Sequence, residues 1–328
     1  MRYRRLGSSD LVVSEISLGT WLSYGEGEVR ARHIACVRRA LDLGVTLFDT
    51  ANVYGWGEAE RLLAEALEGV PRDRYMLATK LWGPMNETDK GLSRAQVFKQ
   101  IDGSLARLKT DYVDLYQCHR YDDETPLAET MEALSEVVRQ GKVRYLGFSE
   151  WPADKVREAM AMAKTEVGVE RFVSSQPQYS MLWRDPEAEV FPLFRELGIG
   201  QLVWAPLAQG VLAGRYPPGA EFPEGWRGES PAMSVHLRRW FSPPVLAAAQ
   251  ALGPIAAEAG LTQAQFAVAW ALDNPDVTSA IVGASRPAQL EDTVAASGAT
   301  VDAALFRQAE QLLDAAMAQA VREETADA

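Results

Sequence analysis

Short apolar runs alternate along this chain with longer segments in which apolar residues recur at helical spacing. The runs are rich in β-branched and aromatic residues, which favour strands, and each is followed by a polar loop. Eight such runs occur, at residues 16–18, 47–48, 75–78, 113–116, 143–148, 172–173, 202–204 and 278–282. Alternation of strand and helix predicts parallel strands with right-handed crossovers. Eight units in one chain favour a closed (β/α)8 TIM barrel over an open doubly wound sheet.

The segments outside these units predict two additions to the barrel. Residues 3–13 hold turn residues between two short runs, which is typical of a β-hairpin. Residues 303–319 have helical spacing and predict an extra C-terminal helix, followed by a frayed tail at about 321–328. No stretch has the composition of a linker, so residues 1–328 are predicted to form one domain.

The longest region without a regular pattern lies near the end of the predicted barrel. It covers residues 205–244 and is rich in Pro, Gly and Trp. Structureless loops of this length inside a domain are usually functional. Trp226 and Trp240 in this region are therefore candidates for a lid over a bound ligand.

The composition is that of a folded acidic protein. Of 328 residues, 47% are hydrophobic and 24% are charged, which excludes a disordered chain. The net charge of −12 argues against nucleic acid or an anionic membrane as the main partner, because both select clustered Lys and Arg. No apolar run approaches the roughly 20 residues of a membrane span, and we expect no secretory signal.

The cysteines and histidines give no sign of a metal or disulfide framework. Cys36 and Cys118 lie outside any C-x-x-C motif, so we expect two reduced thiols in a cytoplasmic protein. His33 and His236 have no partner at metal-ligand spacing, and no metal site is predicted.

Residues that follow the predicted strands are the candidates for chemistry, because barrels of this kind place the active site at the C-terminal strand ends. Four of them form a chemical set: Asp49, Tyr54, Lys80 and His119. A lysine ammonium beside a tyrosine lowers the tyrosine pKa, and a carboxylate keeps the lysine charged and oriented. A neutral imidazole can steer a carbonyl oxygen toward the tyrosine. The set suits delivery of a proton to a carbonyl oxygen while hydride reaches its carbon.

Other interpretations of these residues stay open from the residues alone. Asp49 and Lys80 also suit a core ion pair, and Lys80 at a strand end also suits a Schiff base. Acyl transfer is disfavoured, because no serine or cysteine lies in an evident nucleophile motif. Gly55 and Gly57 begin a G-x-G pattern, but Glu60 stands where a dinucleotide fingerprint has its third glycine.

Several segments resemble the aldo-keto reductase superfamily. They are LFDTANVYG at 47–55, LATK at 77–80, DLYQCHR at 114–120, GFS at 147–149 and WAPLAQG at 204–210. The resemblance covers residues 3–296 and points to a bacterial branch similar to potassium-channel β-subunits. It implies a (β/α)8 barrel that binds a nicotinamide dinucleotide, usually NADPH, without a Rossmann domain. Tyr54 then matches the general acid, Lys80 and Asp49 its supporting pair, and His119 the residue that orients the carbonyl.

The resemblance also assigns residues to the cofactor NADPH/NADP+ and to a small carbonyl substrate. Ser285 and Arg286 match the place of the 2′-phosphate, and Arg suits bidentate phosphate recognition. The chain departs from the family pattern at Glu150, where Asn or Arg is frequent, and at Thr293, where Asn is common. The predicted substrate pocket is Trp21, Tyr54, Trp82 and His119. The resemblance implies cofactor contacts at Thr20, Trp21 and Asp49, at the nicotinamide carboxamide through Ser149 and Gln176, and at a phosphate through Arg227. It implies a pyrophosphate loop of Trp204, Pro206, Leu207, Ala208, Gln209, Gly210 and Arg215, and an adenosine end of Gly283, Ser285, Arg286, Gln289 and Asp292.

Two functions are compatible with this set. The first is NADPH-dependent reduction of an aldehyde or ketone, and the second is a cofactor-binding regulatory or redox-sensing subunit that resembles channel β-subunits. His119 favours the enzyme, because the resemblance implies Asn at this place in channel subunits. Small aldehydes, dicarbonyls and sugar-derived carbonyls all suit the site. Arg120 either attracts an anionic substrate or forms an exposed salt bridge. A homo-oligomer is compatible with the sequence, which does not fix the oligomeric state.

Overall fold

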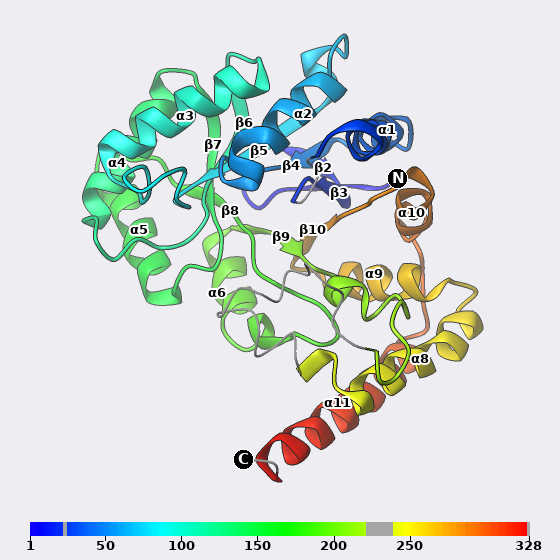
Figure 1. Cartoon of the computed structure of the whole chain (residues 1–328). Coiled ribbons are helices and arrows are strands. Elements are labelled where there is room, and N and C mark those ends of the chain that lie inside the picture. Colours follow the sequence, from blue (N-terminus) through cyan, green and yellow to red (C-terminus); the bar gives the residue numbers. More distant parts are fainter. Residues whose placement is uncertain (22–24, 221–238, 327–328) are drawn as a thin grey trace.

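Eight parallel strands close into a barrel, as predicted (Figure 1). The computed structural model describes residues 1–21, 25–220 and 239–326. Neighbouring strands pair in chain order, and the last closes on the first. The strands are β3 (Ile16–Gly19), β4 (Leu47–Asp49), β5 (Met76–Leu81), β6 (Val113–Cys118), β7 (Val143–Phe148), β8 (Phe172–Ser175), β9 (Gly200–Trp204) and β10 (Val277–Val282).

The barrel strands are covered on both faces, which explains why the sequence shows short apolar runs rather than strict alternation. Every residue of β6 and of β10 is buried. Helices cover the outside of the barrel (Figure 1). They are α1 (Gly27–Asp42), α2 (Glu58–Ala66), α3 (Arg94–Leu108), α4 (Leu127–Arg139), α5 (Ala153–Thr165), α6 (Val190–Leu197), α8 (Pro243–Glu258), α9 (Gln263–Asp273) and α10 (Pro287–Val294).

The helix starts carry the capping chemistry that their sequences indicate. The Ser93 side chain accepts a hydrogen bond from the Gln96 backbone at the start of α3. Thr262 and Gln265 form a reciprocal capping box at the start of α9. Short 3-10 segments complete the loops: η1 (Tyr54–Gly57), η2 (Arg72–Arg74), η3 (Asp185–Glu187) and η4 (Ala208–Gly210).

The predicted hairpin closes the N-terminal end of the barrel. β1 (Tyr3–Arg5) pairs antiparallel with β2 (Val12–Ser14). Leu6, in the turn between them, is 0% exposed and packs on residues inside the barrel such as Leu47, Ala78 and Leu115. Gly7 lets the turn approach this closely, because an added Cβ would lie 2.5 Å from the Gly198 oxygen. At its N-terminal end, the barrel interior is therefore closed and lined by apolar side chains.

Three expectations for the C-terminal third need comment. The last helix, α11 (Ala303–Ala326), packs along α8 and extends well past the predicted end at residue 319, so the tail through 326 is helical rather than frayed (Figure 1). Trp240 is 1% exposed and packs edge-on against Trp183, with ring centroids 6.5 Å apart, so it is a core residue and not a lid. Trp226, Arg227 and His236 lie outside the described residues.

The length and apolar character of each helix decide whether it could cross a membrane. Within the described part of the chain, no single helix is long and apolar enough to cross a membrane; only α8 and α9 taken together reach that length, and they are bent by 81°.

Candidate active site

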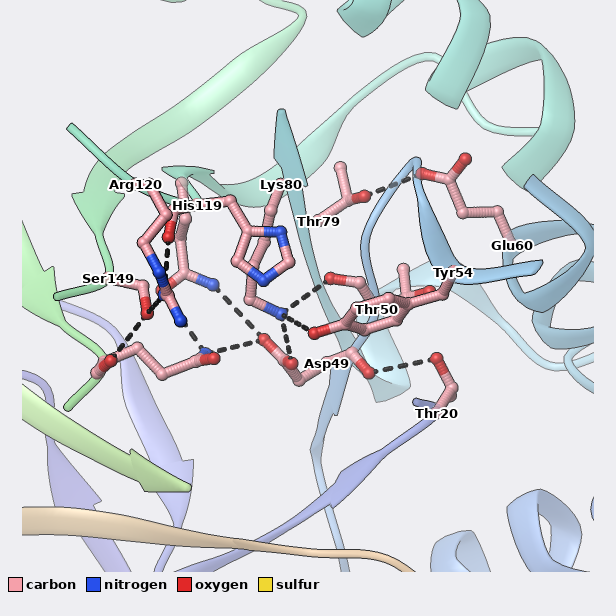
Figure 2. A network of polar contacts seen from close by, with 12 residues as sticks. Thr20, Asp49, Thr50, Tyr54, Glu60, Thr79, Lys80, His119, Arg120 and Ser149 are labelled. Atoms are coloured by element: carbon pink, nitrogen blue, oxygen red, sulfur yellow. Dashed lines mark hydrogen bonds and ion pairs between the residues drawn. The ribbon is translucent and has the colours of Figure 1, made fainter. Parts of the chain in front are cut away.

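The four residues of the predicted chemical set meet at the C-terminal end of the barrel (Figure 2). Asp49 ends β4, Tyr54 begins η1, Lys80 lies in β5, and His119 directly follows β6. The Lys80 Nζ lies 2.5 Å from Asp49 Oδ1 and 3.3 Å from the Tyr54 hydroxyl. It also donates to the Thr50 carbonyl at 2.9 Å. The Lys80 side chain is fully buried, so its charge is balanced within the site.

Aromatic rings enclose the Tyr54 phenol. The His119 ring lies edge-on to the Tyr54 ring, with centroids 5.7 Å apart at 76°. The Trp21 ring lies on another side, with centroids 6.4 Å apart. Trp82 follows β5 directly and is half-buried, like Trp21. Three of the four predicted pocket residues are therefore in contact, and Trp82 occupies the same strand-end rim.

A sharp turn presents Tyr54 to this site. The three residues after it, Gly55, Trp56 and Gly57, all have left-handed backbone angles, with φ of 55°, 56° and 90°. Glycine adopts such angles without a steric cost, whereas a tryptophan pays for them. The G-x-G pattern that failed as a dinucleotide fingerprint thus builds the turn behind the candidate general acid.

Burial dominates the protonation of the site. It raises the pKa of Tyr54, and the Lys80 ammonium lowers that pKa, as its charge predicts, but offsets the effect of burial only in part. Burial acts against the charged form of Lys80, but Asp49 and Tyr54 together outweigh it and raise the Lys80 pKa. Burial, together with the cations Lys80 and Arg120, holds the pKa of His119 well below its usual range. At neutral pH the site holds a neutral phenol, an ammonium and a neutral imidazole.

Two glutamines hold the other carboxylate oxygen, and sequence reasoning gave one of them no role. Asp49 Oδ2 accepts from Gln176 Nε2 at 2.8 Å and from Gln117 Nε2 at 3.2 Å. Gln176 was predicted from the resemblance as a nicotinamide contact, and in this structure its amide is engaged with Asp49. Gln117 was noted at a strand end but was given no role, although it stands two residues after the interior residue Leu115, as Lys80 stands two residues after Ala78.

Hydrogen bonds tie together the C-terminal ends of β7, β8 and β9. The Ser149 hydroxyl donates to the Gln176 carbonyl at 2.8 Å and receives a bond from Arg120 at 3.3 Å. Glu150, whose φ is 53°, accepts from the Gln178 backbone N–H at 2.7 Å and from the Trp204 indole N–H at 3.0 Å. The departure from the family pattern at Glu150 is therefore a bridge between neighbouring strand ends.

The predicted pyrophosphate loop follows β9 in an unusual backbone. Ala205, Ala208 and Gln209 have φ of 56°, 44° and 60°, although none is glycine. Such angles are costly for these residues and concentrate at functional sites. The loop holds the predicted contacts Trp204, Pro206, Leu207, Ala208, Gln209 and Gly210, and Arg215 follows it as an exposed cation.

The predicted adenosine end lies at the start of α10. Arg286 immediately precedes the helix and is exposed, and it forms no ion pair with any described residue. Ser285 bonds the Gln289 side chain through both its backbone N–H and its hydroxyl, each at 2.9 Å. Asp292 accepts from Thr262 and Gln265 of α9. Nothing lies within 4 Å of a Cβ built on Gly283.

Thr20, a predicted cofactor contact, and Thr293, which departs from the family pattern, both form hydrogen bonds to backbone carbonyls. Thr20 bonds the Asp49 carbonyl through its N–H at 2.9 Å and its hydroxyl at 3.2 Å. Thr293 is buried and donates to the Gln289 carbonyl, so it faces its own helix.

Cys36 and Cys118 are free and buried. Among the described residues, no group of three His, Cys, Asp or Glu side chains is placed to hold a metal ion.

Comparison with known proteins agrees with this geometry. The model of the Aldo/keto reductase family matches residues 15–314. A protein of Arabidopsis thaliana named "Probable voltage-gated potassium channel subunit beta" is 38% identical over 300 residues, which covers 90% of this chain and 91% of the relative. A protein of the same name from Oryza sativa subsp. japonica is 37% identical over 300 residues, with the same coverage. The chain belongs to the aldo/keto reductase family.

Proposed function

We propose that this protein reduces aldehydes or ketones to alcohols with NADPH, and that Tyr54 is the general acid. The observation that carries the proposal is the 3.3 Å contact between the Tyr54 hydroxyl and a buried Lys80 that is itself paired with Asp49. A phenol held beside a balanced ammonium, with a neutral imidazole next to it, suits proton transfer to a carbonyl oxygen.

The residues along the same end of the barrel fit a dinucleotide. Arg215 and Arg286 are exposed guanidinium groups, and neither pairs with a carboxylate in the described part of the chain. Arginine suits phosphate oxygens, and the first turn of a helix such as α10 favours an anion in front of it. Gly283 leaves open space at the end of β10. Arg286 would hold the 2′-phosphate that distinguishes NADPH from NADH.

The side chains divide the work as follows. The reduced nicotinamide supplies a hydride when it is bound. The carbonyl oxygen accepts hydrogen bonds from the Tyr54 hydroxyl and the His119 N–H, which polarise the carbonyl and fix its orientation. Tyr54 gives its proton to the oxygen as the C–H bond forms, so the product is an alcohol. The Lys80 ammonium stabilises the phenolate that is left, and Asp49 keeps the ammonium in place.

A second candidate is a cofactor-binding subunit that senses redox state without sustained turnover. The names of the relatives favour it, because they describe potassium-channel β-subunits. A steady-state assay of NADPH oxidation with a panel of aldehydes separates the two functions. Sustained turnover supports the reductase, whereas cofactor binding without turnover supports the subunit.

Substitution of Tyr54 by Phe tests the role of the general acid. The ring and its packing stay, and only the hydroxyl that donates the proton is lost. We expect Tyr54→Phe to lower kcat by roughly 10²–10⁴-fold, the usual contribution of general acid catalysis, while NADPH still binds. Steady-state kinetics and quenching of tryptophan fluorescence by NADPH measure the two quantities.

Tyr116 offers a matched control. Its ring is fully buried, and its hydroxyl bonds the Val97 carbonyl in α3, outside the barrel. Tyr116→Phe removes the same atom from the same residue type, and we expect it to keep kcat near the wild-type value. Unchanged turnover in Tyr54→Phe would refute the assignment of the general acid.

A further inference from the structure

Arg120 occupies the rim of the site, immediately after His119. Its Nη1 donates to the His119 carbonyl at 2.8 Å and to the Ser149 hydroxyl at 3.3 Å (Figure 2). The side chain is half-buried, and no carboxylate of the described residues forms an ion pair with it. The salt bridge that the sequence left open for this residue is thus not formed within the described part of the chain.

Other buried or half-buried cations around the barrel have a carboxylate partner. Lys80 pairs with Asp49, Arg107 with Glu60, and Arg72 with Asp114. A partly buried guanidinium that has lost water and gained no counter-charge is costly. Within the described residues, Arg120 therefore lacks the counter-charge that these cations have, and a bound anion would supply it.

The hydrogen-bond pattern leaves one edge of the guanidinium available. Both contacts of Arg120 use Nη1, and within the described residues neither Nε nor Nη2 donates to a protein acceptor. These two nitrogens form the fork that binds a carboxylate through two parallel N–H···O bonds. The charge also acts on the reacting groups, since Arg120 helps to lower the pKa of His119 and slightly opposes the burial that raises the pKa of Tyr54.

We propose that Arg120 makes this site selective for carbonyl compounds that carry a carboxylate, which it binds while Tyr54 and His119 hold the carbonyl oxygen. The inference rests on the proposed function and narrows its substrate class. A local cation is needed for such a ligand, because the chain carries a net charge of −12 and repels anions at long range. The Trp21 ring beside Tyr54 provides an apolar wall for the body of the substrate.

Two pairs of aldehydes test the selectivity directly. One pair is 4-carboxybenzaldehyde and 4-nitrobenzaldehyde, and the other is 4-oxobutanoate and pentanal. We expect wild type to prefer the carboxylate in at least one pair. In that pair, Arg120→Met should lower the ratio of kcat/KM, carboxylate over neutral, by about 10- to 100-fold. Arg120→Lys should lower it less, because a lysine keeps the charge but loses the fork.

The control removes one positive charge elsewhere. Arg61 lies on the surface of α2, half-exposed and paired with Glu58, so Arg61→Met should leave the ratio unchanged. Thermal unfolding and NADPH binding check that each variant is folded. A ratio that stays within about twofold of wild type in both pairs, while kcat/KM falls equally for charged and neutral aldehydes, would show that Arg120 only positions Ser149 and would overturn the proposal.

A binding measurement separates this inference from the proposed reaction. The alcohol 4-carboxybenzyl alcohol carries the carboxylate but has no carbonyl to reduce, and tryptophan fluorescence follows its binding. Weaker binding to Arg120→Met than to Arg61→Met supports the carboxylate site even if no aldehyde oxidises NADPH, in which case the reductase proposal alone fails. Equal binding to the two variants overturns the carboxylate site, whatever the turnover.

Discussion

Two buried ion pairs lie on opposite sides of strand β5, and Figure 2 shows Lys80 with Asp49 on one side and Thr79 with Glu60 on the other. Lys80 points into the barrel and pairs with Asp49, and the two side chains are 0% and 5% exposed. Its neighbour Thr79 points outward and donates at 2.6 Å to Glu60 of α2, which pairs with Arg107 of α3. Glu60 and Arg107 are 0% and 13% exposed. Each pair thus joins a cation to a carboxylate, is largely buried, and contacts the same strand.

The difference lies in what else touches the cation. Both oxygens of Glu60 have partners, Thr79 and Arg107, and the pair is enclosed between α2, α3 and β5. Lys80 instead contacts a third titratable group, the Tyr54 hydroxyl, at the open end of the barrel. A buried ion pair by itself is weak evidence for function, whereas one that contacts a titratable group at a strand end is a candidate for proton transfer.

Removing the cation from each pair tests this distinction and should give the largest effects. We expect Lys80→Met to lower kcat by about 10²–10⁴-fold, because the phenolate left on Tyr54 loses its counter-charge. We expect Arg107→Met to destabilise the fold by about 3–5 kcal/mol, because Glu60 is left buried and unpaired, with kcat of the folded fraction close to wild type. Urea unfolding and steady-state kinetics measure both variants.

The reverse pattern would break the comparison. If Arg107→Met lost activity as severely as Lys80→Met at a temperature where both are folded, the Glu60–Arg107 pair would also belong to the catalytic machinery. The Lys80 variant leaves Asp49 with the amide donors Gln117 and Gln176, so its loss of stability should be the smaller of the two.

Side chains alternate between the two faces of a strand with a period of two residues. This period explains how much of the fold and the site could be predicted. The strand runs were visible because a closed parallel barrel covers both faces of its strands, and all eight predicted strands exist. The proposed catalytic set was visible because ionisable residues at the ends of buried strands are rare without a role. Asp49, Lys80 and Gln117 each stand two residues after an apolar interior residue, and only the amide, which carries no charge, was passed over.

The sequence did not show the features that depend on tertiary burial. The net direction of the Tyr54 pKa follows from how completely the phenol is enclosed, and spacing alone shows only that Lys80 is near. Trp240 stands in a segment of loop composition, yet packing against Trp183 buries it. The last helix outlasts its predicted end because it packs along α8. Each outcome was decided by a distant part of the chain.

Arg286 extends the comparison from paired cations to an unpaired one, with a smaller expected effect. Removing an arginine that holds no partner in the described protein should cost little stability, in contrast to Arg107. We expect Arg286→Ala to weaken NADPH binding by about 10- to 100-fold and to leave NADH binding nearly unchanged. Fluorescence titration with both cofactors measures the preference, and Arg61→Ala serves as the surface control. A variant that keeps its preference for NADPH would show that the 2′-phosphate binds elsewhere.

The smallest expected effect concerns His119 and the pH dependence of stability. Because burial, with Lys80 and Arg120, holds the folded pKa of His119 well below its usual range, the unfolded chain takes up a proton first as the pH falls. Stability from the neutral imidazole is therefore fully present above the unfolded pKa of about 6.5 and is lost below it, by up to about 1.4 kcal/mol per pH unit. His119→Asn should lose less stability than wild type between pH 6.5 and 5, as measured by urea unfolding. Within the described residues the Glu60–Arg107 pair has no histidine in contact with it. Arg107→Met should therefore keep the wild-type slope of unfolding free energy against pH. If His119→Asn kept that slope too, His119 would be protonated as readily in the folded protein as in the unfolded chain, and the neutral imidazole in our mechanism would have to be abandoned.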